Sequence, residues 1–178
     1  MERRNGKLTF SAAGGTAGEN AKTCKLSIPT AWAAAMGLNE DSRNVELQFD
    51  GKQICIVRPM TAEAFCTAAK QSGHLLRRYD YYDGDLLCAR IYADFTAEEI
   101  FAENTTENTA KTAFGKQLFP TWEDFLTFLE ERCIPRQRAG LRAYLAALGL
   151  EEYDPVEIVE KTGGRMAEDR QWLEVKEL

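Results

Sequence analysis

The pattern of apolar and polar residues changes its period within KLSIPTAWAAAMGL, residues 25–38. Up to Ile28 polar and apolar residues alternate, which is typical of a strand. After Pro29 the apolar residues between Trp32 and Met36 fall three and four apart, which indicates one face of a short helix. Proline favours the first helical turn and Gly37 favours the end of the helix. The pattern therefore predicts a strand that runs directly into a short helix.

Strand-like alternation also occurs on both sides of this helix. The alternating segments are residues 6–12, 22–28, 44–49 and 52–58. Residues 13–21 are rich in glycine and are predicted to form a flexible loop. Asp50-Gly51 is a typical hairpin turn, so the last two segments are expected to pair. The first 59 residues are therefore predicted to form a small, β-rich domain.

From Met60 onward the pattern favours helices, with one strand pair among them. Residues 61–72 are predicted to be a helix capped by Thr61, and residues 75–95 two strands around Asp83-Gly84. Residues 96–104 are predicted to be a short helix, because Thr96 and Glu99 have the spacing of a capping box. Residues 106–117 are polar and are predicted to form a loop.

Three short helices are predicted in the last third of the chain. Thr121 caps the first, Pro135 begins the second, which ends at Gly149, and Asp154-Pro155 begins the third, which ends at Gly163. These helices are expected to form a compact helical subdomain. The domain prediction is thus residues 1–59 and 60–178, and the fold class is α+β with a mixed middle segment and a helical C-terminal part.

Composition is that of a folded protein outside the membrane. Apolar residues make up 44% and charged residues 28% of the chain, and no apolar run approaches the roughly 18–20 residues that a membrane span needs. The N-terminal MERRNGK lacks the apolar core of a secretion signal. We therefore expect a cytoplasmic protein that does not enter a membrane.

The cysteines and the single histidine do not suggest a metal or cofactor site. The five cysteines are widely separated, with no C-x-x-C pair, and His74 has no nearby cysteine. We expect reduced and mostly buried thiols, and no cofactor. No phosphate loop, G-x-S-x-G or H-E-x-x-H motif occurs, so the sequence does not predict an enzyme.

Charge divides the chain in the same way as the hydrophobic pattern. Residues 1–58 carry 8 Lys and Arg against 6 Asp and Glu, a net charge of +2. Residues 59–178 carry 14 against 22, a net charge of −8. A weakly basic part followed by an acidic one predicts two parts with different partners.

The order of elements in residues 6–59 resembles the AbrB/MazE/SpoVT family of bacterial DNA-binding regulators. The positions that carry the resemblance are Leu26, Ile28, Pro29, Trp32, Met36, Gly37, Leu38, Val45, Leu47, Phe49, Ile54, Ile56 and Pro59. The resemblance implies a swapped-hairpin β-barrel, in which two chains interleave their strands into one homodimeric core. It also implies binding of double-stranded DNA, often in autorepression or as the antitoxin of a toxin pair.

The same resemblance implies a basic face assembled from both subunits. Its candidate DNA-binding residues are Arg3, Arg4, Lys7, Lys22, Lys25 and Arg43. Lysine and arginine neutralise phosphates, and arginine also hydrogen-bonds guanine edges. The alternative is that these residues are ordinary solvated surface charges.

Residues 122–175 show a second resemblance, to segments of uncharacterised Firmicutes proteins from mobile elements that also accompany HipA-like kinases. The shared features are R-x-I-P-x-x-R, a helix that ends in L-G-L, and a tryptophan after an aspartate. Because no kinase element is present in this chain, the resemblance implies a partner-binding or regulatory module. The alternative is that these residues only begin or end helices and pack in the core.

Tyrosine and aspartate crowd together in YDYYDGDLL, residues 79–87. The candidate partner-binding residues are Tyr79, Asp80, Tyr82, Asp83 and Asp85. Tyrosine is a frequent interface anchor, and aligned carboxylates can occupy a basic nucleic-acid groove. An ordinary hairpin turn with tyrosines packed beside it is the favoured interpretation.

Three functions fit these patterns: a transcriptional regulator, an antitoxin whose acidic half neutralises a toxin, and a phage or mobile-element inhibitor such as an anti-CRISPR protein. In the last case the acidic surface would block the nucleic-acid channel of a Cas nuclease. Convergence of the basic residues on one face would favour a regulator. Alignment of the acidic residues instead would favour an inhibitor.

Overall fold

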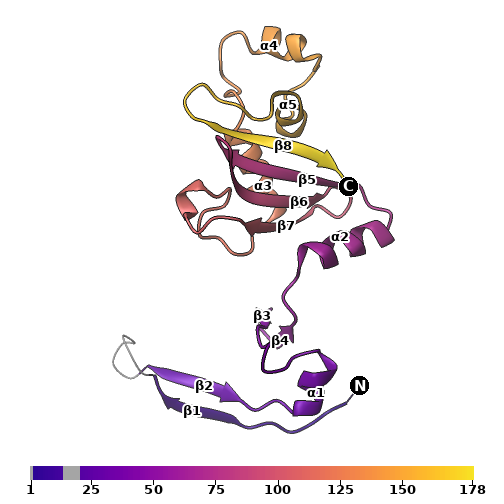
Figure 1. Cartoon of the computed structure of the whole chain (residues 1–178), viewed down its shortest axis with the longest axis vertical. Coiled ribbons are helices and arrows are strands. Elements are labelled where there is room, and N and C mark those ends of the chain that lie inside the picture. Colours follow the sequence, from indigo (N-terminus) through magenta and orange to yellow (C-terminus); the bar gives the residue numbers. More distant parts are fainter. Residues whose placement is uncertain (1, 14–20) are drawn as a thin grey trace. The chain divides into compact units, whose positions relative to one another are not determined.

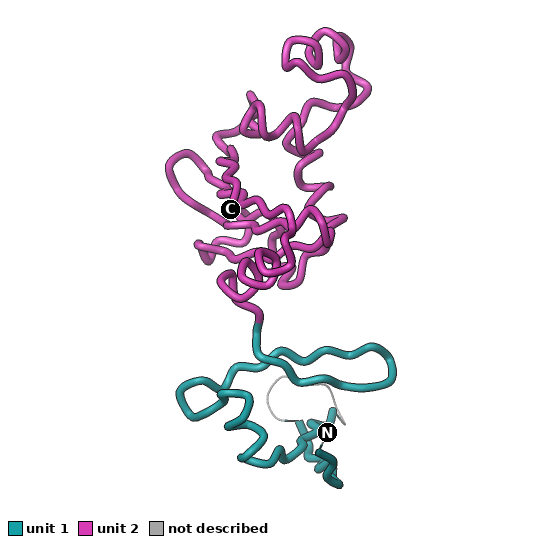
Figure 2. The backbone as a smooth tube through the Cα atoms, turned by 90° about the vertical axis from the view of Figure 1, so that its right-hand side faces the viewer, with its two compact units in different colours: residues 1–59 teal, residues 60–178 magenta. Residues whose placement is uncertain are grey.

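The computed structural model describes residues 2–13 and 21–178, and it contains both helices and β-sheets in an α+β arrangement. The chain divides into two compact units, an N-terminal unit of residues 1–59 and a C-terminal unit of residues 60–178 (Figure 2). Most of the predicted glycine-rich loop, residues 14–20, lies outside the described residues.

The N-terminal unit consists of two hairpins and one short helix. Strands β1 (Leu8–Ala12) and β2 (Lys22–Leu26) pair antiparallel, as do β3 (Glu46–Phe49) and β4 (Ile54–Val57). Helix α1 (Thr30–Ala35) follows Pro29, as the sequence predicts. Within the described residues the two hairpins are separate two-stranded sheets, and no closed barrel is found.

The C-terminal unit is built on a four-stranded antiparallel sheet in the order β7-β6-β5-β8 (Figure 1). The bounds are β5 Leu76–Asp83, β6 Leu86–Asp94, β7 Glu99–Asn104 and β8 Gln171–Glu177. The predicted hairpin at Asp83-Gly84 is confirmed, because Gly84 adopts the left-handed conformation (φ 62°) between β5 and β6.

Helices pack on both faces of this sheet. The helices are α2 (Ala62–Gln71), the 3₁₀ helix η1 (Thr109–Lys111), α3 (Trp122–Glu131), α4 (Leu141–Leu148) and α5 (Pro155–Thr162). Side chains of α3 and α5 cover Tyr79 and Ile91 on one face, where they form the main core. Helix α2 packs its Phe65 and Ala69 near Leu76 and Tyr92 in a second, smaller core.

The predicted helix over residues 96–104 is wrong, because β7 occupies most of this segment. The Asp94 carboxylate accepts hydrogen bonds from the N–H groups of Thr96 and Ala97 and closes a turn. Glu98 then adopts a left-handed conformation (φ 55°), which a continuing helix does not allow. The following residues pair along β6 instead.

The predicted helical subdomain at the C-terminal end is also partly wrong. The second helix begins at Leu141 rather than at Pro135, because residues 135–140 form turns that lead into a left-handed Gly140 (φ 84°). The last segment is strand β8, which pairs along β5. The three C-terminal helices and the sheet therefore belong to one unit.

Candidate functional site

The N-terminal unit has no buried side chain among its described residues. Its large apolar side chains are instead unusually accessible. Those more than half exposed are Leu8, Phe10, Leu26, Leu47, Phe49 and Ile54. Full burial of one such side chain contributes about 1.5–3 kcal/mol, so the unit leaves a large part of its potential stability unused.

Strand register gathers these side chains on one face of each hairpin. In the first hairpin Leu8 lies opposite Leu26 and Phe10 opposite Cys24, so all four share a face. In the second hairpin Leu47 lies opposite Ile56 and Phe49 opposite Ile54. We call these two surfaces the apolar hairpin faces. Each is backed by a more polar face, which in the first hairpin carries Lys25.

An apolar groove of about 500 Å³ lies within the N-terminal unit. Leu26, Ile28, Trp32, Met36 and Ile54 are among its lining residues. The Trp32 indole N–H donates a hydrogen bond of 2.6 Å to the carboxylate of Glu2 at one side. A continuous apolar surface of this kind, in a unit without a buried core, is typical of a surface that another protein chain covers.

The six predicted DNA-binding residues are exposed, but they do not share one face. Lys22 and Lys25 lie three positions apart on β2 and therefore point to opposite sides of the hairpin. Arg4 lies beside the apolar groove. Arg3 and Lys7 precede β1, and Arg43 precedes β3. Over residues 2–13 and 21–178, no ion pair involves any of the six.

Two of the predicted partner-binding residues are not on the surface. Tyr79 has an exposed fraction of 0%, and its ring packs edge-to-face on Phe125 with centroids 5.2 Å apart. Asp80 is 3% exposed and lies among cations, with Arg78 Nη2 at 3.0 Å and Lys176 Nζ at 3.1 Å from its Oδ2. This part of the prediction is wrong, because β5 has both of its faces largely covered.

The other three partner-binding candidates form the end of the β5–β6 hairpin. Tyr82 stacks on Trp172 with ring centroids 4.5 Å apart, and Asp83 forms an ion pair of 2.6 Å with Lys111. Asp85 is exposed in the turn. These contacts match the interpretation favoured from the sequence, that of an ordinary hairpin turn with aromatic residues packed beside it.

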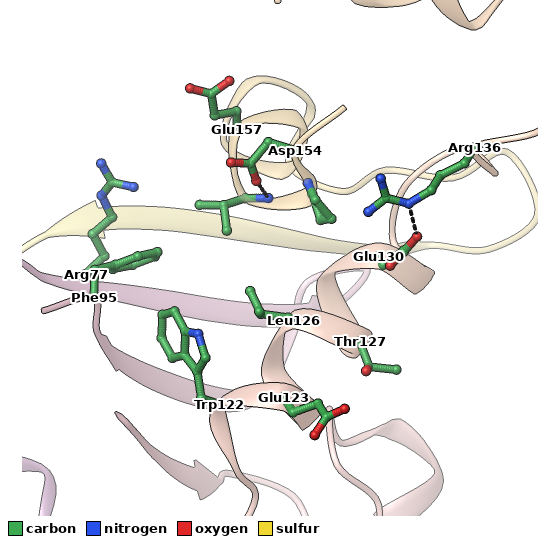
Figure 3. Close-up of a pocket in the computed structure, with 12 residues that line it drawn as sticks. Arg77, Phe95, Trp122, Glu123, Leu126, Thr127, Glu130, Arg136, Asp154 and Glu157 are labelled. Carbon is green, nitrogen blue, oxygen red and sulfur yellow. Dashed lines mark hydrogen bonds and ion pairs between the residues drawn. The ribbon is translucent and has the colours of Figure 1, made fainter. Parts of the chain in front are cut away.

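A groove of about 530 Å³ in the C-terminal unit was not anticipated from the sequence (Figure 3). Its lining comes from the start of β5, the residue after β6, helix α3 and the start of α5. Phe95, Trp122 and Leu126 form apolar walls, and Glu123 and Glu157 lie at its rim. Acidic residues at helix starts were visible in the sequence, but only the fold brings them beside the partly buried Trp122.

The thiols are all free, and only two of the five are buried. Cys88 and Cys133 lie in the core, whereas Cys24 and Cys55 are exposed on the hairpins, so the expectation of mostly buried thiols is wrong. Burial raises the pKa of the Cys133 thiol to about 11. This thiol is therefore protonated and unreactive at neutral pH.

Within the residues that the structure describes, no three His, Cys, Asp or Glu side chains gather as a metal site would require. None of the described helices has the length and apolar character needed to cross a membrane. The chain matches no protein-family model, and neither the curated proteins nor the solved structures contain a match.

Proposed function

We propose that the protein is a dimeric DNA-binding regulator or antitoxin-like protein whose N-terminal unit forms a swapped-hairpin barrel of the AbrB type. The observation that carries this proposal is the pair of apolar hairpin faces in a unit whose described residues, 2–13 and 21–59, include no buried side chain. A second copy of the same unit offers matching apolar surface, and interleaving the hairpins of two chains would create one shared core.

In such a dimer the polar faces of the hairpins turn outward. On the first hairpin this face carries Lys25 together with Thr9, Ser11 and Thr23. Lysine and hydroxyl side chains are frequent contacts of phosphate oxygens in DNA complexes. Two N-terminal units together carry a net charge of about +4, which favours DNA modestly and makes binding sensitive to salt.

The C-terminal unit has its own core and is proposed to bind a protein partner. Its net charge of −8 disfavours contact with DNA. The alternative function, inhibition of a Cas nuclease through aligned acids, has less support. Asp80 and Asp83 already have cationic partners within the unit and are not a free row of carboxylates.

Titration of full-length protein against random duplex DNA at about 50 and 200 mM salt tests this proposal. We expect binding that weakens steeply with salt. Lys25→Gln should weaken it at every sequence and reduce the salt slope by about one phosphate contact. Lys161→Gln, which removes the same charge from the end of α5, is the matched control and should change neither quantity.

Two outcomes would contradict DNA binding by the hairpin face. One is the absence of any complex at the lower salt concentration. The other is an equal loss of affinity in the Lys25 and Lys161 variants, which would indicate only a general response to net charge.

A further inference from the structure

The groove of the C-terminal unit has an aromatic and aliphatic wall. Trp122, the first residue of α3, packs edge-to-face on Phe95 with ring centroids 5.2 Å apart and at 89°. Leu126 lies one turn further along α3, and Val156 at the start of α5 also lines the groove. Figure 3 shows Trp122 and Leu126 below the start of α5, and the groove lies between these two side chains and α5.

The rim of this groove carries carboxylates without a cationic partner. Over residues 2–13 and 21–178 neither Glu123 nor Glu157 takes part in an ion pair, and both are exposed. Glu157 lies on α5 and Glu123 on α3, on opposite sides of the groove (Figure 3). The negative charge is therefore distributed across the groove rather than gathered at one point.

The two arginines of the lining do not neutralise these carboxylates. Arg77 pairs with Glu160, outside the groove lining, and Arg136 pairs with Glu130 at 2.6 Å. Both guanidinium groups are thus already matched by an acid. Counted together, the lining residues keep an excess of negative charge.

Aromatic rings beside carboxylates form a favourable site for a cationic side chain. The same unit uses this combination twice near the groove. The Arg77 guanidinium carbon lies 4.9 Å from the centroid of the Phe95 ring while the same side chain pairs with Glu160. Arg136 lies 4.2 Å from the Tyr153 centroid while it pairs with Glu130. Among residues 2–13 and 21–178, no cation lies over the Trp122 ring and none pairs with the adjacent Glu123.

We propose that this groove is the docking site for a basic segment of a partner protein, and that it holds one Lys or Arg side chain beside Trp122 and Glu123 and another near Glu157. The separation of the two acids suits an extended segment with several cationic side chains better than a compact ligand with one. Leu126 and Val156 offer contacts for apolar residues between them. The site gives the proposed partner-binding role of the C-terminal unit a location, and it does not depend on DNA binding by the N-terminal unit.

Nuclear magnetic resonance of the ¹⁵N-labelled full-length protein tests this site directly. The probe is a capped five-residue peptide that alternates leucine with arginine or lysine. We expect the indole N–H resonance of Trp122, assigned through Trp122→Phe, to shift saturably during the titration. The indole resonances of Trp32 and Trp172 should stay in place and serve as internal references for the fold.

Matched charge variants separate the groove from general electrostatic attraction. Glu123→Gln combined with Glu157→Gln should weaken peptide binding by about fivefold or more, because two exposed ion pairs with the peptide are lost together. Glu151→Gln combined with Glu152→Gln removes the same charge from the exposed turn before α5 and should leave the affinity nearly unchanged. A peptide with glutamate in place of the basic residues should not shift Trp122.

Three results would overturn the proposal: no shift of Trp122 at millimolar basic peptide, equal losses in the two double variants, or equal binding of the glutamate peptide. None of these results affects the interpretation of the DNA titration, which tests the hairpin face of the N-terminal unit.

Discussion

At the scale of single residues, Arg132 is a buried charge of the C-terminal unit that is matched by several partners. Its side chain is buried, with an exposed fraction of 7% for the residue, and its guanidinium forms two hydrogen bonds of 2.6 and 2.9 Å with the Asp169 carboxylate. The remaining donors bond the backbone oxygens of Gly164 and Gln171 and the side-chain Oε1 of Gln171. A buried cation is tolerated only when it is matched in this way, so Arg132 ties the end of α3 to the segment that leads into β8.

We expect Asp169→Asn to lower the free energy of unfolding of the C-terminal unit by about 2 kcal/mol or more, because it leaves the buried guanidinium without its counter-ion. Urea denaturation at neutral pH, followed by tryptophan fluorescence, measures the change. Glu168→Gln removes the neighbouring exposed charge and should alter stability by less than about 0.5 kcal/mol. Similar effects of the two substitutions would contradict the role given to the ion pair.

The same carboxylate should make stability depend on pH. Hydrogen bonds from Arg132 hold the pKa of Asp169 below its ordinary value of 3.8, although partial burial acts in the opposite direction. A lowered folded-state pKa contributes stability that is present above the unfolded-state value and is lost as pH falls through the folded value. Urea titrations from pH 7 down to about 2 should therefore show the wild type and Asp169→Asn converging below about pH 4. A gap between them that stays constant across this range would contradict the assignment.

At the scale of elements, local signals predicted helices well and distant pairings poorly. Thr61, Thr121 and Asp154 all accept a backbone hydrogen bond at the helix starts predicted for them. These capping signals act over three or four residues, and the hydrogen bonds that they predict are present in the structure. The capping-box spacing at Thr96 was overridden, because β7 gains its hydrogen bonds from β6 rather than from its own neighbours. Strand β8 depends in the same way on β5, which precedes it by about ninety residues.

We expect Thr121→Ala to destabilise the C-terminal unit by about 1 kcal/mol, because it removes half of a reciprocal capping box. The Thr121 hydroxyl oxygen accepts from the Asp124 N–H at 3.2 Å, and the Asp124 carboxylate accepts from the Thr121 N–H at 2.7 Å. Thermal unfolding compares this variant with Thr127→Ala, an exposed threonine inside the same helix. If the two variants unfold alike, the cap contributes nothing specific.

The candidate sites were only partly predictable for the same physical reason. Residue types indicated that Lys22 and Lys25 could contact phosphates, but their odd spacing along β2 places them on opposite faces of the hairpin, which residue types alone do not show. Alternation along YDYYD implies that Tyr79 and Asp80 point to opposite sides, yet whether either side is covered depends on helices much later in the chain. The Trp122 groove joins segments with no relation in sequence, and no local pattern predicts it.

At the scale of the whole molecule, the two units are stabilised in different ways. The C-terminal unit contains every buried side chain among the described residues, whereas the N-terminal unit contains none. A unit stabilised by its own core unfolds independently of protein concentration. A unit stabilised by a second copy gains stability as the concentration rises.

We therefore expect the full-length protein to be a dimer at micromolar concentration and Phe49→Ser to weaken its association at least tenfold. Light scattering and sedimentation equilibrium measure the effect. Phe119→Ser is a matched control, because Phe119 is exposed to a similar degree (67% against 69%) but lies in the C-terminal unit. A strict monomer for the wild type, or equal weakening by both substitutions, would contradict the swapped-hairpin barrel.

Strand β8 lies beside β5 in the sheet, but it comes about ninety residues later in the chain. This separation has a consequence for synthesis on the ribosome. The hairpin of β5 and β6 can form as soon as it emerges, but one edge of β5 has no partner until residues 171–177 have also been made. During that interval the nascent chain exposes an unpaired strand edge, and Arg132 lacks its counter-ion Asp169. A message cut short before these codons would thus yield a chain that aggregates or is degraded, and the cell would accumulate only products that carry the last strand.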